Sequence, residues 1–138
     1  MLPKIRLQIL TLITALLLPL SCSFFPLDET PIVFVHGNGD TAAVWHTTMW
    51  RFESNAYPRD YLFAIDFTYP SSLTNDAVPE EGRSSTTDQM NQLSEFVDTV
   101  LDETGKDKVI LIGSSRGGNA IRNYIKNGGG TVKVSHAI

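Results

Sequence analysis

The sequence predicts an α/β fold whose mostly parallel sheet is covered by helices on both faces. Two apolar runs, residues 31–35 and 109–112, have the length and branched side chains of strands buried on both faces, and each leads into a glycine-rich turn. Segments with helical spacing of apolar residues alternate with the strands. The resulting order is strand, helix, strand, helix, strand, helix and one more strand, which is typical of a parallel sheet.

Composition favours a single globular domain. The chain has 138 residues, of which 42% are hydrophobic and 19% charged, unlike a disordered or fibrous chain. Its 15 acidic residues exceed its 11 basic ones and give a net charge of −4, which argues against nucleic acid as a partner. The single cysteine, Cys22, cannot form an intramolecular disulfide, so the fold must be held by its core.

Residues 1–23 have the pattern of a secretory signal peptide and are excluded from the predicted fold. Lys4 and Arg6 precede an apolar run, residues 7–20, that is short for a membrane span and is followed by small residues. The alternative is a membrane anchor that stays attached. The signal predicts export from the cell.

The end of the signal has two interpretations. Cleavage after Ser23 would leave residues 24–138 as a secreted or periplasmic domain with a net charge of −6 and no cysteine. Residues 20–22 also resemble a bacterial lipoprotein box, in which cleavage after Ser21 would leave a lipidated Cys22 as a membrane tether. Export is expected in both cases.

The segment after the first strand is expected to form a helix capped by Asp40 or Thr41. Its apolar residues are dense enough for a helix that is largely buried: Ala42, Ala43, Val44, Trp45, Met49, Trp50 and Phe52. Residues 61–67 predict the next strand, which Asp66 closes. Residues 69–82 are polar and predict a surface loop, which at the end of a strand would lie near the functional cleft.

The sequence predicts where the second helix begins and where it ends. Ser85, with Asp88 three residues later, predicts an N-terminal capping box, and Gly105 predicts the C-terminal stop. Apolar residues at helical spacing between these ends predict a face packed in the core: Met90, Leu93, Val97, Val100 and Leu101. The third helix stops at residues 127–130, and residues 131–138 predict the last strand.

The third strand turns into a helix through the pattern Gly-x-Ser-x-Gly at residues 113–117. A serine on such a sharp turn projects its hydroxyl above the sheet, so Ser115 is the candidate nucleophile. Gly113 and Gly117 would let the strand and helix backbones pass close together. The backbone N–H of Arg116 would lie at a helix N-terminus, where unpaired amides favour negative charge. The alternative is a glycine-rich surface turn.

A second motif follows the first strand, where His36, Gly37 and Gly39 form a tight turn. The two motifs, about 75 residues apart and each in a strand-turn-helix setting, resemble the α/β-hydrolase fold and, within it, secreted bacterial lipases and esterases. The resemblance covers residues 31–138. It implies the N-terminal half of that fold, beginning at its third strand, with the strand order 4-3-5-6.

The resemblance also implies an activity. The protein would be a serine hydrolase that acts on ester or lipid substrates, and no cofactor is implied. In that family the residue after His-Gly gives the second oxyanion-hole amide, which maps to Asn38, while His36 and Gly37 shape the loop. The Arg116 side chain has two interpretations, packing beside the turn through ion pairs or contacting an anionic substrate group, and we favour the first.

The family resemblance further implies that the triad acid and histidine follow the serine in the chain. Between Arg116 and Ile138 there is no Asp or Glu, and His136 falls inside the last strand. We therefore expect residues 24–138 to be a partial domain, truncated before the acid and histidine of an enzyme of roughly 250–300 residues, and to be inactive alone. The other candidates for an acid or base are His36, His46, His136, Asp40 and Asp66.

Two alternatives remain. The chain could be a binding module or inactive fragment with a hydrolase-like half-fold. A dinucleotide-binding domain is a remote alternative, because Gly37, Gly39 and Ala42 fit the pattern G-x-G-x-x-A and Asp66 ends the next strand. Metal and phosphate sites are not predicted, since the sequence has no H-E-x-x-H motif, no paired cysteines and no G-x-x-x-x-G-K-[ST] motif.

Overall fold

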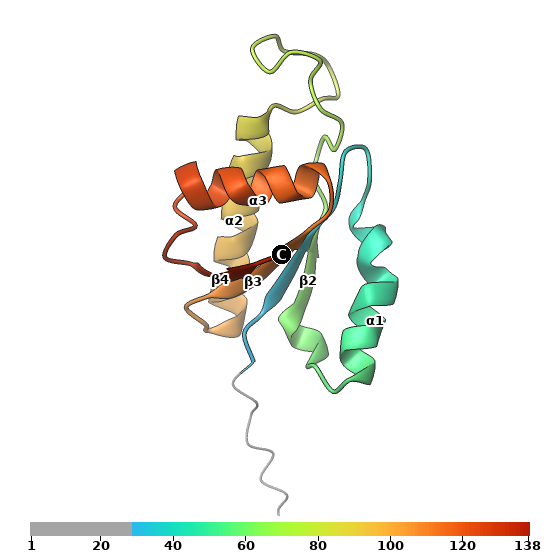
Figure 1. Cartoon of the computed structure of the whole chain (residues 1–138), viewed down its shortest axis with the longest axis vertical. Helices are drawn as coiled ribbons and strands as arrows, with labels where there is room; N and C mark the ends of the chain where they lie inside the picture. The colour runs from blue at the N-terminus through green and yellow to red at the C-terminus, as the bar shows by residue number, and fades with distance from the viewer. Residues whose placement is uncertain (1–28) are drawn as a thin grey trace, which may run out of the picture.

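The computed structural model describes residues 29–138, which form a four-stranded, all-parallel sheet flanked by helices (Figure 1). The strands lie in the order β2-β1-β3-β4 and span β1 (Ile32–Val35), β2 (Leu62–Ile65), β3 (Val109–Gly113) and β4 (Val134–Ala137). This arrangement confirms the predicted sheet. It also confirms the order 4-3-5-6, because β1 and β3 are the central pair.

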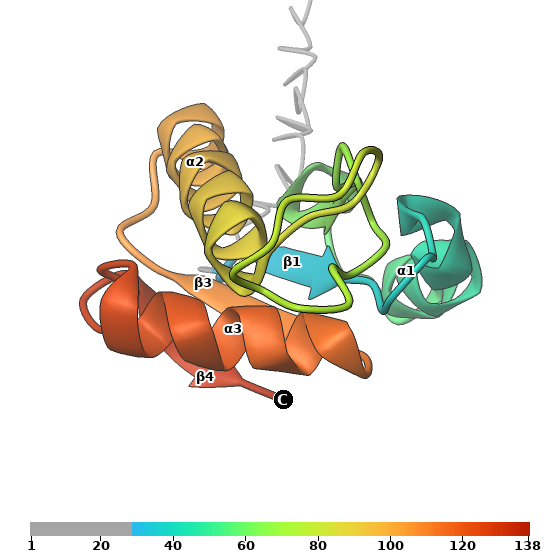
Figure 2. The same cartoon turned by 90° about the horizontal axis from the view of Figure 1, so that it is seen from above.

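The helices cover both faces of the sheet, as predicted. They are α1 (His46–Ser54), α2 (Thr86–Thr104) and α3 (Arg116–Asn127), with short 3-10 turns η1 (Ala42–Trp45) and η2 (Arg59–Tyr61). Seen from above, α2 and α3 lie side by side on one face and α1 lies on the other (Figure 2). The central strands are therefore covered on both sides.

The central strand β1 shows how the core is divided. Val33 and Val35 pack with α2 and α3, whereas Ile32 and Phe34 pack with α1. Successive side chains of a strand point to opposite faces, so a strand covered on both sides must be apolar at every position. All four residues of β1 are buried, which explains the uninterrupted apolar run.

The first helical segment differs from the prediction. It is divided into η1 and α1, and of its apolar residues only Met49 is buried, while Val44 and Trp50 are 50% and 64% exposed. Thr41, one of the two predicted caps, accepts a hydrogen bond from the Ala43 N–H at 3.3 Å. The prediction of a largely buried helix was wrong, because α1 packs on the sheet along one side and no other described element covers its outer side.

Two predicted strands are shorter than expected. Residues 61–67 form a strand only over Leu62–Ile65, because Tyr61 belongs to η2 and the Phe67 N–H donates to the His36 ring instead of to β1. Residues 131–138 form β4 only over Val134–Ala137. Both differences lie at strand ends and leave the topology unchanged.

The predicted ends of α2 are confirmed. The Ser85 hydroxyl accepts a hydrogen bond from the Asp88 N–H at 3.0 Å, and the Asp88 carboxylate accepts one from the Ser85 N–H at 2.9 Å. Hydrogen bonds from the Ser85 N–H and hydroxyl lower the pKa of Asp88. Gly105 ends the helix in the left-handed conformation with φ 64°, which glycine adopts without strain.

The predictions for residues 1–23, the signal peptide and the lipid attachment at Cys22, lie outside the described residues. Within residues 29–138, no helix is both long and apolar enough to cross a membrane.

The capping box predicts a specific loss of stability. Replacing Ser85 with alanine removes a side-chain acceptor from the first turn of α2, which should lower the free energy of unfolding by about 1 kcal/mol. Urea unfolding followed by circular dichroism would measure the change. The matched control is Thr87→Ala in the same turn, where the side chain is exposed and the free energy should change by less than about 0.5 kcal/mol. Equal effects of the two substitutions would contradict the assigned role of Ser85.

Candidate active site

Ser115 lies between the end of β3 and the start of α3. Its backbone has φ 53° and ψ −119°, a conformation that non-glycine residues rarely adopt and that costs of order 1–3 kcal/mol. The residue is exposed and occupies the N-cap position of α3, yet its side chain makes no capping hydrogen bond. Ser115 therefore has the backbone of a sharp strand-to-helix turn and a hydroxyl that does not serve the helix.

The flanking glycines allow this turn to form. A Cβ added to Gly117 would lie 2.3 Å from the Val35 carbonyl oxygen, and one added to Gly113 would lie 2.6 Å from the Ile121 Cδ1 and 2.8 Å from the Gly118 nitrogen. Real side chains do not approach so closely. Both positions therefore require glycine for the close passage of strand and helix that the sequence predicts.

The two sequence motifs lie side by side. Val35 pairs with Gly113 in the parallel register of β1 and β3, and the Ser114 N–H donates to the Val35 carbonyl at 3.1 Å. Two residues beyond this pair, a Cβ built on Gly37 would lie 3.3 Å from the Ser115 Cβ. The turn after β1 thus flanks the candidate nucleophile.

The His36 ring is buried, and both of its nitrogens are used. Nε2 accepts a hydrogen bond from the Phe67 N–H at 3.2 Å, so the ring proton resides on Nδ1, which donates to the Gly37 carbonyl at 2.9 Å. The Asp66 carboxylate lies 3.7 Å from Nε2. These contacts hold the turn after β1 against the end of β2.

Two backbone amides next to Ser115 have no acceptor. Within residues 29–138, neither the Asn38 N–H nor the Arg116 N–H donates to a protein oxygen. Arg116 is the first residue of α3, where the amides of the first turn and the helix dipole favour a negative charge. The arrangement can bind an oxyanion that forms beside the Ser115 hydroxyl.

The other candidate acids and bases do not join this cluster. Among the described residues, no histidine hydrogen-bonds to the Ser115 hydroxyl. His46 is exposed on α1, and His136 is exposed in β4. The Asp66 carboxylate accepts the Ala42 N–H at 3.3 Å, and the Asp40 Oδ2 lies 3.2 Å from a Cβ built on Gly37. Residues 29–138 also hold no group of three or more His, Cys, Asp or Glu side chains placed to bind a metal.

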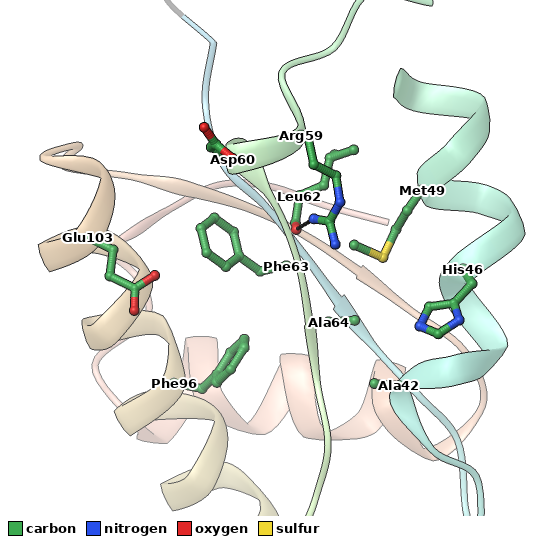
Figure 3. Close-up of a pocket in the computed structure, with 10 residues that line it drawn as sticks. All are labelled: Ala42, His46, Met49, Arg59, Asp60, Leu62, Phe63, Ala64, Phe96 and Glu103. Atoms are coloured by element: carbon green, nitrogen blue, oxygen red, sulfur yellow. Dashed lines mark hydrogen bonds between the residues drawn. The ribbon is translucent and has the colours of Figure 1, made fainter. Parts of the chain in front are cut away.

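Two cavities must be distinguished. One of about 750 Å³ surrounds the free edge of β2, with Phe63 and Phe96 on one side of the strand and Met49 and His46 on the other (Figure 3). Its lining does not include Ser115. A smaller one of about 300 Å³ lies beside the strand-to-helix turn at Ser115 and is lined by these residues: Gly113, Ser115, Gly118, Asn119, Ile121, Arg122, Ala137 and Ile138. The smaller cavity is therefore the one that adjoins the candidate nucleophile.

The loop between β2 and α2 makes contacts that the sequence did not predict. The Asn38 Oδ1 accepts the Ser72 N–H at 2.7 Å, and the Arg116 guanidinium donates to the carbonyl oxygens of Pro70 at 3.1 Å and Ser84 at 2.6 Å. The structural interpretation of Arg116 assumed ion pairs, but its hydrogen bonds go to the Ser84 hydroxyl at 3.3 Å and to backbone carbonyl groups. Every residue has such a group, so no sequence signal marks these partners.

The comparison with known proteins identifies the family. The model of the family described as lipase (class 2) matches residues 29–138. The chain belongs to the class 2 lipase family. This result supports an ester-hydrolase family and agrees with the resemblance to lipases and esterases.

Solved α/β-hydrolases share the fold. The mature form of Bacillus licheniformis lipase BlEst2 is 22% identical with a TM-score of 0.59, and an extracellular α/β-hydrolase from a Paenibacillus species is 15% identical with a TM-score of 0.56. Each alignment covers 79% of this chain and 39% of the other. Naproxen esterase from Bacillus subtilis is 25% identical, with a TM-score of 0.50 and coverages of 81% and 35%. The class 2 lipase chain thus spans about two fifths of the length of these neighbours.

The dinucleotide-binding alternative is not favoured. In that fold the third strand continues outward from the second, whereas here β3 pairs with β1 on the side opposite β2. The turn at Gly37 and Gly39 leads into a 3-10 turn, and α1 begins only at His46. The phosphate site at a helix N-terminus, which the glycine pattern would serve, is therefore not formed.

Two neighbouring glycines predict opposite effects on stability. Gly117→Ala places a methyl group 2.3 Å from the Val35 carbonyl oxygen and should lower the free energy of unfolding by several kcal/mol or prevent folding. Gly118→Ala meets nothing within 4 Å and should be neutral or raise the free energy of unfolding by about 0.5–1 kcal/mol, because alanine favours a helix. Urea unfolding and soluble yield would measure both. A folded, unperturbed Gly117→Ala variant would contradict the close passage of α3 over β1.

Proposed function

We propose that this class 2 lipase chain supplies the nucleophile and the oxyanion hole of an exported carboxylic-ester hydrolase. One observation carries the proposal. Ser115 occupies a strained strand-to-helix turn, and two unpaired amides belong to its neighbours: Arg116 follows it in the chain, and Asn38 follows Gly37, which lies beside it. Strain of this kind is retained where a function requires the conformation.

The chemistry follows from this arrangement. A histidine takes the proton from the Ser115 hydroxyl while the oxygen attacks the ester carbonyl carbon, forming a tetrahedral oxyanion. The Asn38 and Arg116 amides donate hydrogen bonds to that oxyanion, and each such donor is typically worth about 3 kcal/mol. Collapse of the intermediate expels the alcohol, which takes the proton from the histidine, and leaves the acyl group on Ser115. Water, deprotonated by the same histidine, then attacks the acyl carbonyl and releases the acid and the free serine.

The base and the acid of the triad are proposed to come from residues outside 29–138. Within that range no histidine bonds to Ser115, and the histidine that follows the serine, His136, is exposed in β4. The family resemblance implies that both groups follow later strands, which supports this proposal. Without a base, serine is a weak nucleophile, so residues 24–138 alone are proposed to be inactive.

We also propose a substrate class and a cellular location for the protein. The class 2 lipase family and neighbours described as a lipase and as a naproxen esterase favour carboxylic esters. The alcohol and acyl length would follow from assays with nitrophenyl esters of increasing chain length. Export rests on the signal predicted for residues 1–23, with cleavage after Ser23 for a secreted or periplasmic protein. A lipid on Cys22 would instead tether the enzyme to a bacterial membrane.

The first test separates an enzyme from a non-catalytic half-fold. Residues 24–138 should show no hydrolysis of short or long esters, whereas a version extended through the later strands should be active and should react with a fluorophosphonate probe at Ser115. Ser115→Ala in the extended version should abolish labelling and lower turnover by several orders of magnitude. Ser114→Ala is the control for the neighbouring hydroxyl. Hydrolysis by residues 24–138 that depends on Ser115 would contradict the proposed position of the base.

A second test addresses the oxyanion hole. Asn38→Pro in the extended version removes the N–H and should lower kcat by about 100-fold or more with a smaller change in KM. Asn38→Ala keeps the N–H and should have a smaller effect. Steady-state kinetics of the two folded variants would decide. Unchanged turnover of Asn38→Pro would exclude Asn38 as an oxyanion donor.

A further inference from the structure

The Pro70 carbonyl oxygen is a junction between the two segments that flank Ser115. It accepts one hydrogen bond from the Gly39 N–H at 3.2 Å and another from Arg116 Nη1 at 3.1 Å. Gly39 directly follows Asn38, and Arg116 directly follows Ser115. One carbonyl therefore connects the backbone N–H that follows Asn38 with the side chain of Arg116.

The part of the loop that holds Pro70 is itself fixed. We call residues 69–73 with Ser84 the loop base, because Ser72 and Ser84 form a parallel bridge there. The Ser84 N–H donates to the Ser71 carbonyl at 2.9 Å, and the Ser84 hydroxyl, which is buried, donates to the Tyr69 carbonyl at 2.6 Å. The loop base is a closed, hydrogen-bonded unit.

Arg116 joins the loop base to α3 through three hydrogen bonds from two nitrogen atoms. Besides Pro70, its Nη1 lies 3.3 Å from the Ser84 Oγ, and its Nη2 donates to the Ser84 carbonyl at 2.6 Å. Burial lowers the pKa of Arg116, while the carboxylates of Asp76 and Asp88 oppose this effect. A planar guanidinium can bond several fixed oxygens at once, which a lysine cannot reproduce.

On the other side of the site, Asn38 is tied to the same loop base. Its Oδ1 accepts the Ser72 N–H at 2.7 Å. Both proposed oxyanion donors thus belong to residues whose side chains bind one loop. Because their amides are on separate segments, their spacing depends on the contacts that link these segments.

We propose that the Arg116 side chain is a positioning residue that, through the loop base, sets the separation of the Asn38 and Arg116 amides. The inference rests on the proposed function. The Nη1 and Nη2 donors of Arg116 already bond protein oxygens. The guanidinium therefore acts on the spacing of the two amides rather than on a substrate anion. Loss of this link would misplace donors that matter mainly in the transition state, and a displacement of about 1 Å can cost about 100-fold.

The test uses Arg116→Met in the extended, active protein. We expect kcat to fall by about 10- to 100-fold with KM within about twofold, and the inhibition constant of an alkylboronic acid, which mimics the tetrahedral intermediate, to rise by a similar factor. Arg116→Lys should recover part of the loss. Lys126→Met, which removes an exposed charge from the same helix, should leave kcat and boronate binding unchanged.

Thermal unfolding of each variant separates positioning from loss of folded protein. If Arg116→Met does not fold, Ser84→Ala gives the second measurement, because it removes one acceptor of Arg116 and the donor to Tyr69, and should shift kcat and boronate binding in the same direction by a smaller factor. A folded Arg116→Met variant with wild-type kcat and boronate binding would overturn the inference, as would a rise confined to KM. Absence of Ser115-dependent hydrolysis in the unsubstituted protein would instead overturn the proposed function.

Discussion

The parallel pairing of β1 with β3 is the contact on which the candidate site depends. It sets Val35 opposite Gly113, so the chain segments that leave these two strands emerge side by side and bring Gly37 next to Ser115. A slip of one residue would turn the buried side chains of β1 to the opposite face, so the two-sided core strongly favours the observed register. The packing of the core thus determines the geometry of the site.

Two glycines allow α3 to pack closely against the paired strands β1 and β3. Gly117 lets the first turn of α3 pass over the carbonyl groups at the end of β1, and Gly113 leaves room for Ile121. The close approach places the N-terminus of α3, with its unpaired amides, beside the turn after β1. The strained backbone of Ser115 is maintained by these surroundings, since the strands and α3 fix the chain on both sides of it.

Hydrogen bonds of polar groups fix the turn after β1. The turn after β1 is held from below by the buried His36 ring and from the side by the loop base, which also binds the Arg116 guanidinium. The loop is exposed and polar, yet its base is held by hydrogen bonds among its own residues and with Asn38 and Arg116. A surface loop can therefore form a rigid wall of a site that the sheet alone would leave open.

The sequence by itself determined the order of the elements, the ends of α2 and the position of the strand-to-helix turn at Ser115, because these features depend on local chemistry. Apolar periodicity, the Ser85–Asp88 capping box and the Gly-x-Ser-x-Gly spacing each act within a few residues. Only the tertiary structure decided which side of a helix is covered, so Trp50 is exposed although its segment is rich in apolar residues. It also decided the partners of Arg116, since backbone carbonyl groups far apart in the chain carry no sequence signature and become acceptors only where folding brings them within reach.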